Sequence, residues 1–437
     1  MTAPRKQANL PSAAPAPGSA NSQSGSVPPG AAVTRAADGT FRSLRHRNFQ
    51  LYFGGQLVSV AGTWMQAVAQ AWLVYQISHS DLTLGIVGFA AAIPALIISP
   101  FGGVIVDRVP KRAVLIGAQV GAMLLAFILA ALAFTHTVQV WHIVLLAAGL
   151  GVVNAFDGPA RQAFVVEMVG REDLTNAIAV NSMMFNSARV IGPAIGGLLL
   201  ASVGAAWCFL LNGLSYLAVI AGLWAMQLPP RTIQRSVAAP LSAMASGLRF
   251  VWHQVDLFAL LLIALVYAVF GLSYATVLPA FADQVLHSGA TGYGLLNAAT
   301  GVGAVLGALI IARTGGGRRG RWLVWTSLAF PVILFAFAYV NVYSLSLLLA
   351  LALGLFFMLQ FTLINTMLQM RVGDEMRGRV LSLYTLTFFG FAPFGNLAMG
   401  NLAEYWGLSF TIGIGAVVAL ILFVVILLVV PRLRHLT

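Results

Sequence analysis

The sequence predicts an all-α integral membrane protein whose twelve transmembrane helices form two pseudo-symmetric bundles of six. Composition, the spacing of basic residues and a weak repeat between the halves support this prediction. Of the 437 residues, 59% are apolar and only 8% are charged, and the mean hydropathy is +0.89. A soluble globular protein carries roughly 25% charged residues, so the composition excludes that class.

The formal net charge of +12 would suggest a nucleic-acid partner in a soluble chain. Here the few charges sit between long apolar runs, so we expect a lipid bilayer and no nucleic acid. The single cysteine, Cys208, excludes a disulfide framework and any cysteine-rich metal site. The sequence therefore predicts no metal, no other cofactor and no catalytic residue, and we expect a monomer.

Residues 1–47 are predicted to be a disordered cytoplasmic tail. Pro, Ala, Ser and Gly dominate its first forty residues, and no periodic apolar face is present. The tail also lacks the apolar core of a signal peptide, so we expect no cleavage.

Basic residues recur in clusters along the rest of the chain. The clusters are Arg42, Arg45 and Arg47; Arg108, Lys111 and Arg112; Arg161 and Arg171; Arg231, Arg235 and Arg249; Arg313, Arg318, Arg319 and Arg321; Arg371, Arg377 and Arg379; and Arg432 and Arg434. Successive clusters lie roughly 50 to 65 residues apart, the length of two membrane helices and a turn. Because Lys and Arg favour cytoplasmic loops, we expect a multi-pass protein of the cytoplasmic (inner) membrane with both termini in the cytoplasm.

The predicted N-terminal bundle covers residues 48–227 and the C-terminal bundle covers residues 255–430. The expected spans are 49–76, 82–107, 112–134, 140–167, 175–203 and 206–227 in the first bundle, and 255–283, 291–313, 322–340, 344–370, 379–404 and 408–430 in the second. Residues 431–437 form a second cytoplasmic tail.

Residues 228–254 form the longest hydrophilic connection and are predicted to be a cytoplasmic central loop. Leu241, Met244, Leu248 and Val251 recur at helical spacing, which indicates a short amphipathic helix on the cytoplasmic surface. A plain linker is the alternative.

The two bundles resemble each other weakly in sequence. His79-Ser80 after the first span lines up with His287-Ser288 after the seventh, and Met168 starts a run similar to the one at Met370. Two related halves with a substrate path between them are a carrier architecture.

Polar residues follow one face of several spans. The first span carries them at steps of three and four residues, so they share a face. The substrate path is predicted to be lined by Gln56, Thr63, Gln66, Gln70, Asn154, Asn186, Asn365, Gln369 and Asn396. The alternative is that these side chains only join helices through hydrogen bonds. Candidate aromatic walls of this path are Trp64, Trp72, Phe156, Phe185, Tyr267, Tyr274, Phe388 and Phe389, but lipid-facing packing is the more common fate of such residues.

Three charged residues, Asp157, Arg161 and Arg189, are predicted to lie well inside the membrane. Such groups are costly there and usually face a partner or a water path. Asp157 and Arg161 are four residues apart, hence adjacent on one helix face. A proton and charge relay is one interpretation, in which Asp157 carries a proton and the arginines contact an anionic group. A permanent structural ion pair is the other. We interpret Asp283 and Glu404 as surface residues.

Two motifs resemble those of the major facilitator superfamily. The run from Gly102 to Arg112 resembles its loop signature after the second helix, with Pro110 in place of the usual second glycine. The resemblance implies a cytoplasmic gate of Gly103, Asp107, Arg108, Lys111 and Arg112. The fifth span resembles the antiporter motif of the drug exporters, through Gly192, Pro193, Gly196 and Gly197. Pro193 removes one helix hydrogen bond and the glycines permit close helix approach.

Residues 156–164 and 247–251 are similar to the transmembrane secretion effector branch, which contains the enterobactin exporter. This resemblance covers about residues 48–430. It implies a secondary exporter of a small amphiphilic molecule, a siderophore or a drug, that exchanges substrate for protons by alternating access. A proton-coupled importer and a broad multidrug carrier remain as alternatives.

Other classes of function fit the sequence less well. The only lysines, Lys6 and Lys111, lie outside any Gly-Lys-Ser/Thr motif, which excludes an ATP-driven pump within this chain. No His-Glu-x-x-His motif or cysteine pair suggests a membrane enzyme. A receptor or assembly factor on the same scaffold is a further alternative.

Overall fold

The structure is a computed structural model that describes residue 2 and residues 42–170, 172–227, 240–313 and 319–435. Most of the predicted tail of residues 1–47 lies outside the described residues. Its last part forms a short 3-10 helix, η1 (Arg42–Arg45), and Arg47 begins the first membrane helix. The backbone N–H of Ser43 donates to Asn176 Oδ1 at 2.8 Å, and His46 Nε2 lies 2.7 Å from Asp173 Oδ2.

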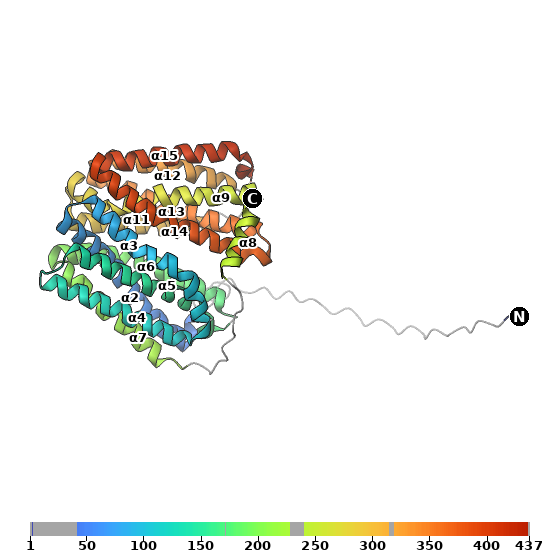
Figure 1. Cartoon of the computed structure of the whole chain (residues 1–437), viewed down its shortest axis with the longest axis horizontal. Coiled ribbons are helices and arrows are strands. Elements are labelled where there is room, and N and C mark those ends of the chain that lie inside the picture. The colour runs from blue at the N-terminus through green and yellow to red at the C-terminus, as the bar shows by residue number, and fades with distance from the viewer. Residues whose placement is uncertain (1, 3–41, 171, 228–239, 314–318, 436–437) are drawn as a thin grey trace, which may run out of the picture. The chain divides into compact units, whose positions relative to one another are not determined.

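Within the described residues, twelve helices are long and apolar enough to cross a membrane. In the first half these are α2 (Arg47–Ser78), α3 (Asp81–Arg108), α4 (Lys111–Phe134), α5 (Val140–Val169), α6 (Leu174–Ser202) and α7 (Ala205–Ala225). In the second half the first span begins with α9 (Val255–Val266), and the others are α11 (Gly289–Arg313), α12 (Arg319–Tyr339), α13 (Tyr343–Arg371), α14 (Asp374–Trp406) and α15 (Leu408–Val429). The predicted all-α fold of twelve spans is confirmed (Figure 1).

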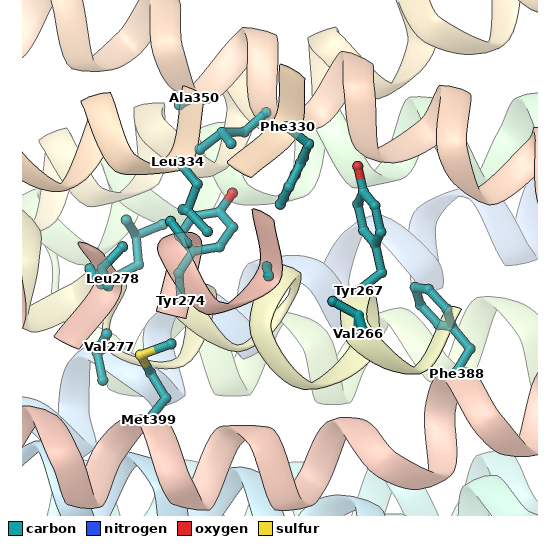
Figure 2. Packing of buried hydrophobic residues seen from close by; sticks show 14 of the residues in the cluster. Val266, Tyr267, Tyr274, Val277, Leu278, Phe330, Leu334, Ala350, Phe388 and Met399 are labelled. Carbon is teal, nitrogen blue, oxygen red and sulfur yellow. The ribbon is translucent and has the colours of Figure 1, made fainter. Parts of the chain in front are cut away.

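The seventh span is not the continuous α-helix that the sequence predicts over residues 255–283. After α9 the backbone changes to a π-helix, η2 (Tyr267–Gly271), a 3-10 turn, η3 (Ser273–Thr276), the short α10 (Leu278–Ala280) and a second π-helix, η4 (Phe281–Val285). Such changes in a membrane helix require neighbouring groups to satisfy the backbone. Figure 2 shows Tyr267, Tyr274 and Leu278 of this span beside Phe330 and Leu334 of α12.

Left-handed turns recur at equivalent places in the two halves. His79 after the first span has φ 48°, and His287 after the seventh has φ 47°. Ser80 then caps α3, because its Oγ accepts a hydrogen bond from the Thr83 N–H at 3.3 Å. The weak sequence repeat therefore corresponds to a repeated backbone conformation.

Two pairs of helices form the largest contacts between the two halves. α3 of the first half lies against α14 of the second, and α6 lies against α11. Glycines allow these approaches: a Cβ at Gly400 of α14 would lie 2.5 Å from the Asp81 carbonyl oxygen of α3. A residue with a side chain would force the two helices apart.

The loop predicted at 228–254 contains a helix, α8 (Pro240–Trp252), which contacts α14 and α3. Residues 228–239 and the Leu241 and Met244 side chains lie outside the described residues. Gly247 and Val251 are buried, whereas Leu248 is exposed although its spacing placed it on the same face. Gly247 lies on the contact with α14, where its Cβ would be 3.2 Å from Arg379 Cβ. The predicted second tail, residues 431–437, begins with the 3-10 helix η5 (Pro431–His435).

Candidate functional site

A cavity of about 150 Å³ lies where the seventh span departs from α-helical geometry. Its walls come from α2, α6, η2, η3, α10, α11, α12 and α13, and therefore from both halves of the chain. The lining residues are Trp64, Arg189, Pro193, Gly271, Leu272, Tyr274, Ala275, Leu278, Asn297, Thr300, Phe330, Leu353 and Phe357. Between the halves, a cavity lined by a broken helix is the usual place for a carrier's substrate.

Arg189 supplies the only charge among the residues that line this cavity. Its guanidinium carbon lies 5.6 Å from the centroid of the Trp64 ring and 5.6 Å from that of the Phe357 ring. Trp64 is on α2 of the first half and Phe357 is on α13 of the second. Both contacts have the geometry of cation–π interactions. Arg189 thus lies between aromatic rings from the two halves.

The second buried charge site joins α5 to α2 and α4. Arg161 Nη2 donates to Asp157 Oδ2, and Arg161 Nη1 donates to Gln56 Oε1. The other carboxylate oxygen, Asp157 Oδ1, accepts from Gln119 Nε2 at 2.9 Å. The Arg161 guanidinium also lies 5.5 Å from the centre of the Phe185 ring. Asp157 and Arg161 are therefore paired inside the first half, and Arg189, which the sequence grouped with them, lies in a separate place.

Hydrogen bonds join the two halves at one end of the bundle. Glu404 Oε2 in the last turn of α14 accepts three hydrogen bonds from the start of α3. The donors are Ser80 Oγ at 2.9 Å and the backbone N–H groups of Asp81 and Leu82 at 2.7 and 3.2 Å. We call this end, where α14 ends and α3 begins, the closed end.

A further hydrogen bond joins the halves at the closed end. Tyr75 Oη donates to Asp283 Oδ2 at 2.9 Å, which links the end of α2 to η4. Glu404 is exposed, as expected of a surface residue, whereas Asp283 is half-buried, and each of them also accepts hydrogen bonds across the interface between the halves. Their partners are more than 200 residues away in the sequence.

The glycines predicted as an antiporter motif bring α6 close to two neighbours. A Cβ at Gly192 would lie 2.5 Å from the Ala61 carbonyl oxygen of α2, and one at Gly196 would lie 3.1 Å from Met65 Cα. A Cβ at Gly197 would lie 2.6 Å from the Gly294 Cα of α11. Pro193 lies within α6 and lines the cavity. The motif thus allows α6 to contact both halves at once.

The predicted gate residues lie at the opposite end from the closed end. Lys111 Nζ pairs with Glu167 Oε1 at 2.9 Å, and Arg112 donates to the Trp224 and Met226 carbonyls. Arg108 is exposed, while the Gly103 and Asp107 side chains lie outside the described residues. The described contacts of Lys111 and Arg112 stay within the first half, so the role of these five residues as a gate remains a prediction.

The nine polar residues predicted to line the path lie outside the described cavity lining. Gln56 and Gln66 are buried, and both form hydrogen bonds within the first half. Gln56 accepts from Arg161, and Gln66 accepts from Asn212 Nδ2 at 2.7 Å. These two bonds join α2 to α5 and to α7. Thr63, Asn154 and Gln369 are exposed, and Gln70, Asn186, Asn365 and Asn396 are half-buried. A place for all nine in the substrate path stays a prediction.

Several lining residues were not found from the sequence. Trp64 and Tyr274 were candidate aromatic walls and line the cavity, but Asn297, Thr300 and Phe357 were missed. Asn297 and Thr300 are three residues apart on α11, so a polar pair on one face was the available signal.

Comparison with known proteins places this architecture in a family. A family described as transmembrane secretion effector matches residues 38–436. The staphyloferrin A transporter of Staphylococcus aureus is 25% identical over 370 residues, which cover 83% of this chain and 91% of the relative. The multidrug efflux pump Tap of Mycolicibacterium fortuitum is 28% identical over 87% of this chain and 95% of its own.

Other relatives agree with these. The enterobactin exporter EntS of Escherichia coli (strain K12) is 27% identical over 89% of this chain and 93% of the relative. Among solved structures, the nucleoside transporter NupG aligns with a TM-score of 0.68 at 13% identity, covering 88% of this chain and 98% of that one. A bacterial homologue of Spinster in an inward-facing conformation aligns with a TM-score of 0.60 at 18% identity, over 91% and 96%.

These matches cover both halves and concern membrane transporters, not enzymes. The chain therefore belongs to the transmembrane secretion effector family, within the major facilitator superfamily of multi-pass membrane transporters.

Proposed function

We propose that this protein is a secondary active exporter that moves a small amphiphilic molecule, a siderophore or a drug, by alternating access. The observation that carries the proposal is the cavity between the halves, which are joined by hydrogen bonds at one end of the bundle. The names of the relatives, two of which are called an exporter or an efflux pump, support the direction.

The proposed orientation puts the closed end outside the cell. Basic residues flank the opposite end, and such residues favour the cytoplasm, so both termini are placed there in the cytoplasmic membrane. In this orientation the structure corresponds to a carrier whose outer end is closed. Proteolysis of tags on either terminus in sealed inside-out vesicles tests the orientation, because only cytoplasmic tags are cut.

Transport itself is tested in inside-out membrane vesicles with enterobactin and, separately, with the cationic dye ethidium. We expect uptake that needs an acidic vesicle lumen and no ATP, because the lumen corresponds to the cell exterior. Uptake only in right-side-out vesicles would show an importer. If the purified, folded protein transports neither enterobactin nor ethidium, a receptor or assembly role is favoured. Uptake of both probes at similar rates would favour a broad multidrug carrier.

The proposed proton carrier is Asp157, because it is the buried carboxylate beside Arg161. A protonated Asp157 no longer compensates the arginine, so proton uptake would rearrange this site. Asp157→Asn keeps the size of the side chain and is expected to abolish the pH dependence of transport. Glu172→Gln, which alters an exposed acid, is the matched control. Unchanged pH dependence in Asp157→Asn would remove this residue from the mechanism and leave the ion pair a structural role.

Light scattering of the purified protein tests the expected monomer.

A further inference from the structure

Arg189 lies near the middle of α6, with no ion pair to any residue that the structure describes. This differs from Arg161, whose two terminal nitrogens both have acceptors. The contacts of Arg189 are with the faces of the Trp64 and Phe357 rings. Rings attract a cation but do not neutralise it. The site therefore keeps a net positive charge in the membrane interior, where charge is costly.

Among the residues that the structure describes, no acid compensates Arg189 in the cavity beside it. Its described lining contains no Asp or Glu, and its polar members besides Arg189 are Tyr274, Asn297 and Thr300. The amide of Asn297 donates to the Tyr293 carbonyl at 3.0 Å and Thr300 Oγ1 donates to the Leu296 carbonyl at 3.0 Å, so both bond their own helix. The guanidinium is the charged donor in the described lining, beside the neutral donors of Trp64, Tyr274 and Asn297.

A cation and a flat apolar wall favour a particular kind of ligand. A guanidinium binds carboxylates through two parallel hydrogen bonds, and such charge-assisted bonds are stronger than neutral ones. The Trp64 and Phe357 rings offer faces on which a flat apolar group can stack. A cationic molecule would instead meet a like charge within the same small space.

We propose that Arg189 binds the anionic group of the transported molecule, a carboxylate or phenolate, and that the rings beside it hold a flat apolar part. This inference rests on the proposed transport function only for the statement that the ligand is the substrate. It predicts that the cavity binds organic anions in preference to cations.

The test is binding of three probes of equal ring size to the full-length protein in lipid nanodiscs. The probes are 2-naphthoate, its neutral carboxamide and the cationic 2-naphthylmethylamine, and equilibrium dialysis against empty nanodiscs corrects for partition into lipid. We expect naphthoate to bind tightest. Arg189→Gln should weaken naphthoate binding roughly 10- to 100-fold and leave the carboxamide nearly unchanged.

Further variants separate charge from folding. Arg189→Lys keeps the positive charge but not the planar guanidinium that forms two parallel hydrogen bonds, so it should retain part of the preference for naphthoate. Phe357→Ala keeps the arginine and should weaken all three probes alike. Arg321→Gln removes an exposed cation and is the matched control. The proposal is overturned if the wild-type protein binds the three probes equally or prefers the amine, or if folded Arg189→Gln still prefers naphthoate.

Binding is measured here without transport. Protein that binds naphthoate through Arg189 but moves nothing in vesicles would refute the proposed transport and leave the anion site. Ethidium transport by a protein with no preference for naphthoate would refute the anion site and leave the proposed transport.

Discussion

Replacing Glu404 by alanine is expected to weaken the closed end and to shift the protein toward a state in which this end is open. Glu404 accepts three hydrogen bonds at the first turn of α3, and all three cross from one half to the other. They must break for the end to open. The substitution therefore destabilises only the closed state, whereas loss of a contact inside one half would affect both states alike.

The expected magnitude follows from helix capping. Loss of a side chain that caps a helix N-terminus costs about 0.5–2 kcal/mol, which corresponds to a roughly 2- to 30-fold increase in the ratio of open to closed molecules. Glu404→Gln keeps an acceptor but removes the charge, so its effect should lie between those of the wild type and Glu404→Ala.

Double electron–electron resonance measures the distance distribution between two spin labels, and this distribution gives the ratio of open to closed molecules. Labels at Thr137→Cys and Val342→Cys report the separation of the halves at the closed end, because both residues are exposed in its turns. The buried native Cys208 is replaced by alanine in the background. Glu172→Gln, which changes an exposed acid at the other end, is the control. Equal distance distributions in Glu404→Ala and the wild type would refute the reasoning.

Three further variants test other contacts. Tyr75→Phe removes the bond to Asp283 and should shift the same spin-label distances in the same direction, by about 1 kcal/mol, which is the usual net worth of one hydrogen bond. Gly197→Leu places a side chain where even a Cβ would lie 2.6 Å from Gly294 Cα, so it should abolish vesicle uptake, whereas Gly158→Ala, with no atom within 4 Å of the new Cβ, should retain it. Arg161→Met leaves a buried carboxylate without its partner and should lower the free energy of unfolding by about 3–5 kcal/mol, measurable as a lower melting temperature; an unchanged melting temperature would mean that the pair contributes little.

The positions of the spans were predictable because they depend on local composition. The predicted span 140–167 compares with Val140–Val169 in the structure, and the span 408–430 compares with Leu408–Val429. The break in the seventh span was missed because α-, π- and 3-10 helices can hold the same apolar residues. Gly271, Ser273 and Pro279 were the local signals, but such residues also occur in continuous membrane helices.

The site was only partly predictable because its contacts are long-range. Arg189 was identified as a buried charge, and Gly192 to Gly197 as a motif for close packing. Which rings surround Arg189 depends on how α2 and α13 meet α6, and no periodicity encodes that. Likewise Glu404 has the sequence of a surface residue at a helix end. Its partner Ser80 lies 324 residues earlier, and only the packed structure brings the two together.

The two buried arginines differ in how a movement of the halves would affect them. The partners of Arg161 all belong to the first half, so a rigid movement of one half against the other leaves them in place. Arg189 contacts a ring from each half, so the same movement must change its surroundings. A ligand shifts a conformational equilibrium only through its different affinities for the two states. Arg189 is therefore the better placed of the two to link substrate binding to opening.

Helix α2 contacts both sites. Gln56, which binds Arg161, and Trp64, which lies against Arg189, are eight residues apart on this helix, or about 12 Å along its axis. Protonation of Asp157 would free Arg161 to change its bond to Gln56, and a shift of α2 would then move Trp64 against Arg189. Proton and substrate would be coupled through one helix, without direct contact between their sites. If so, Gln56→Leu should uncouple proton movement from transport while substrate binding at Arg189 persists. Tight coupling in that variant would exclude α2 as the connection.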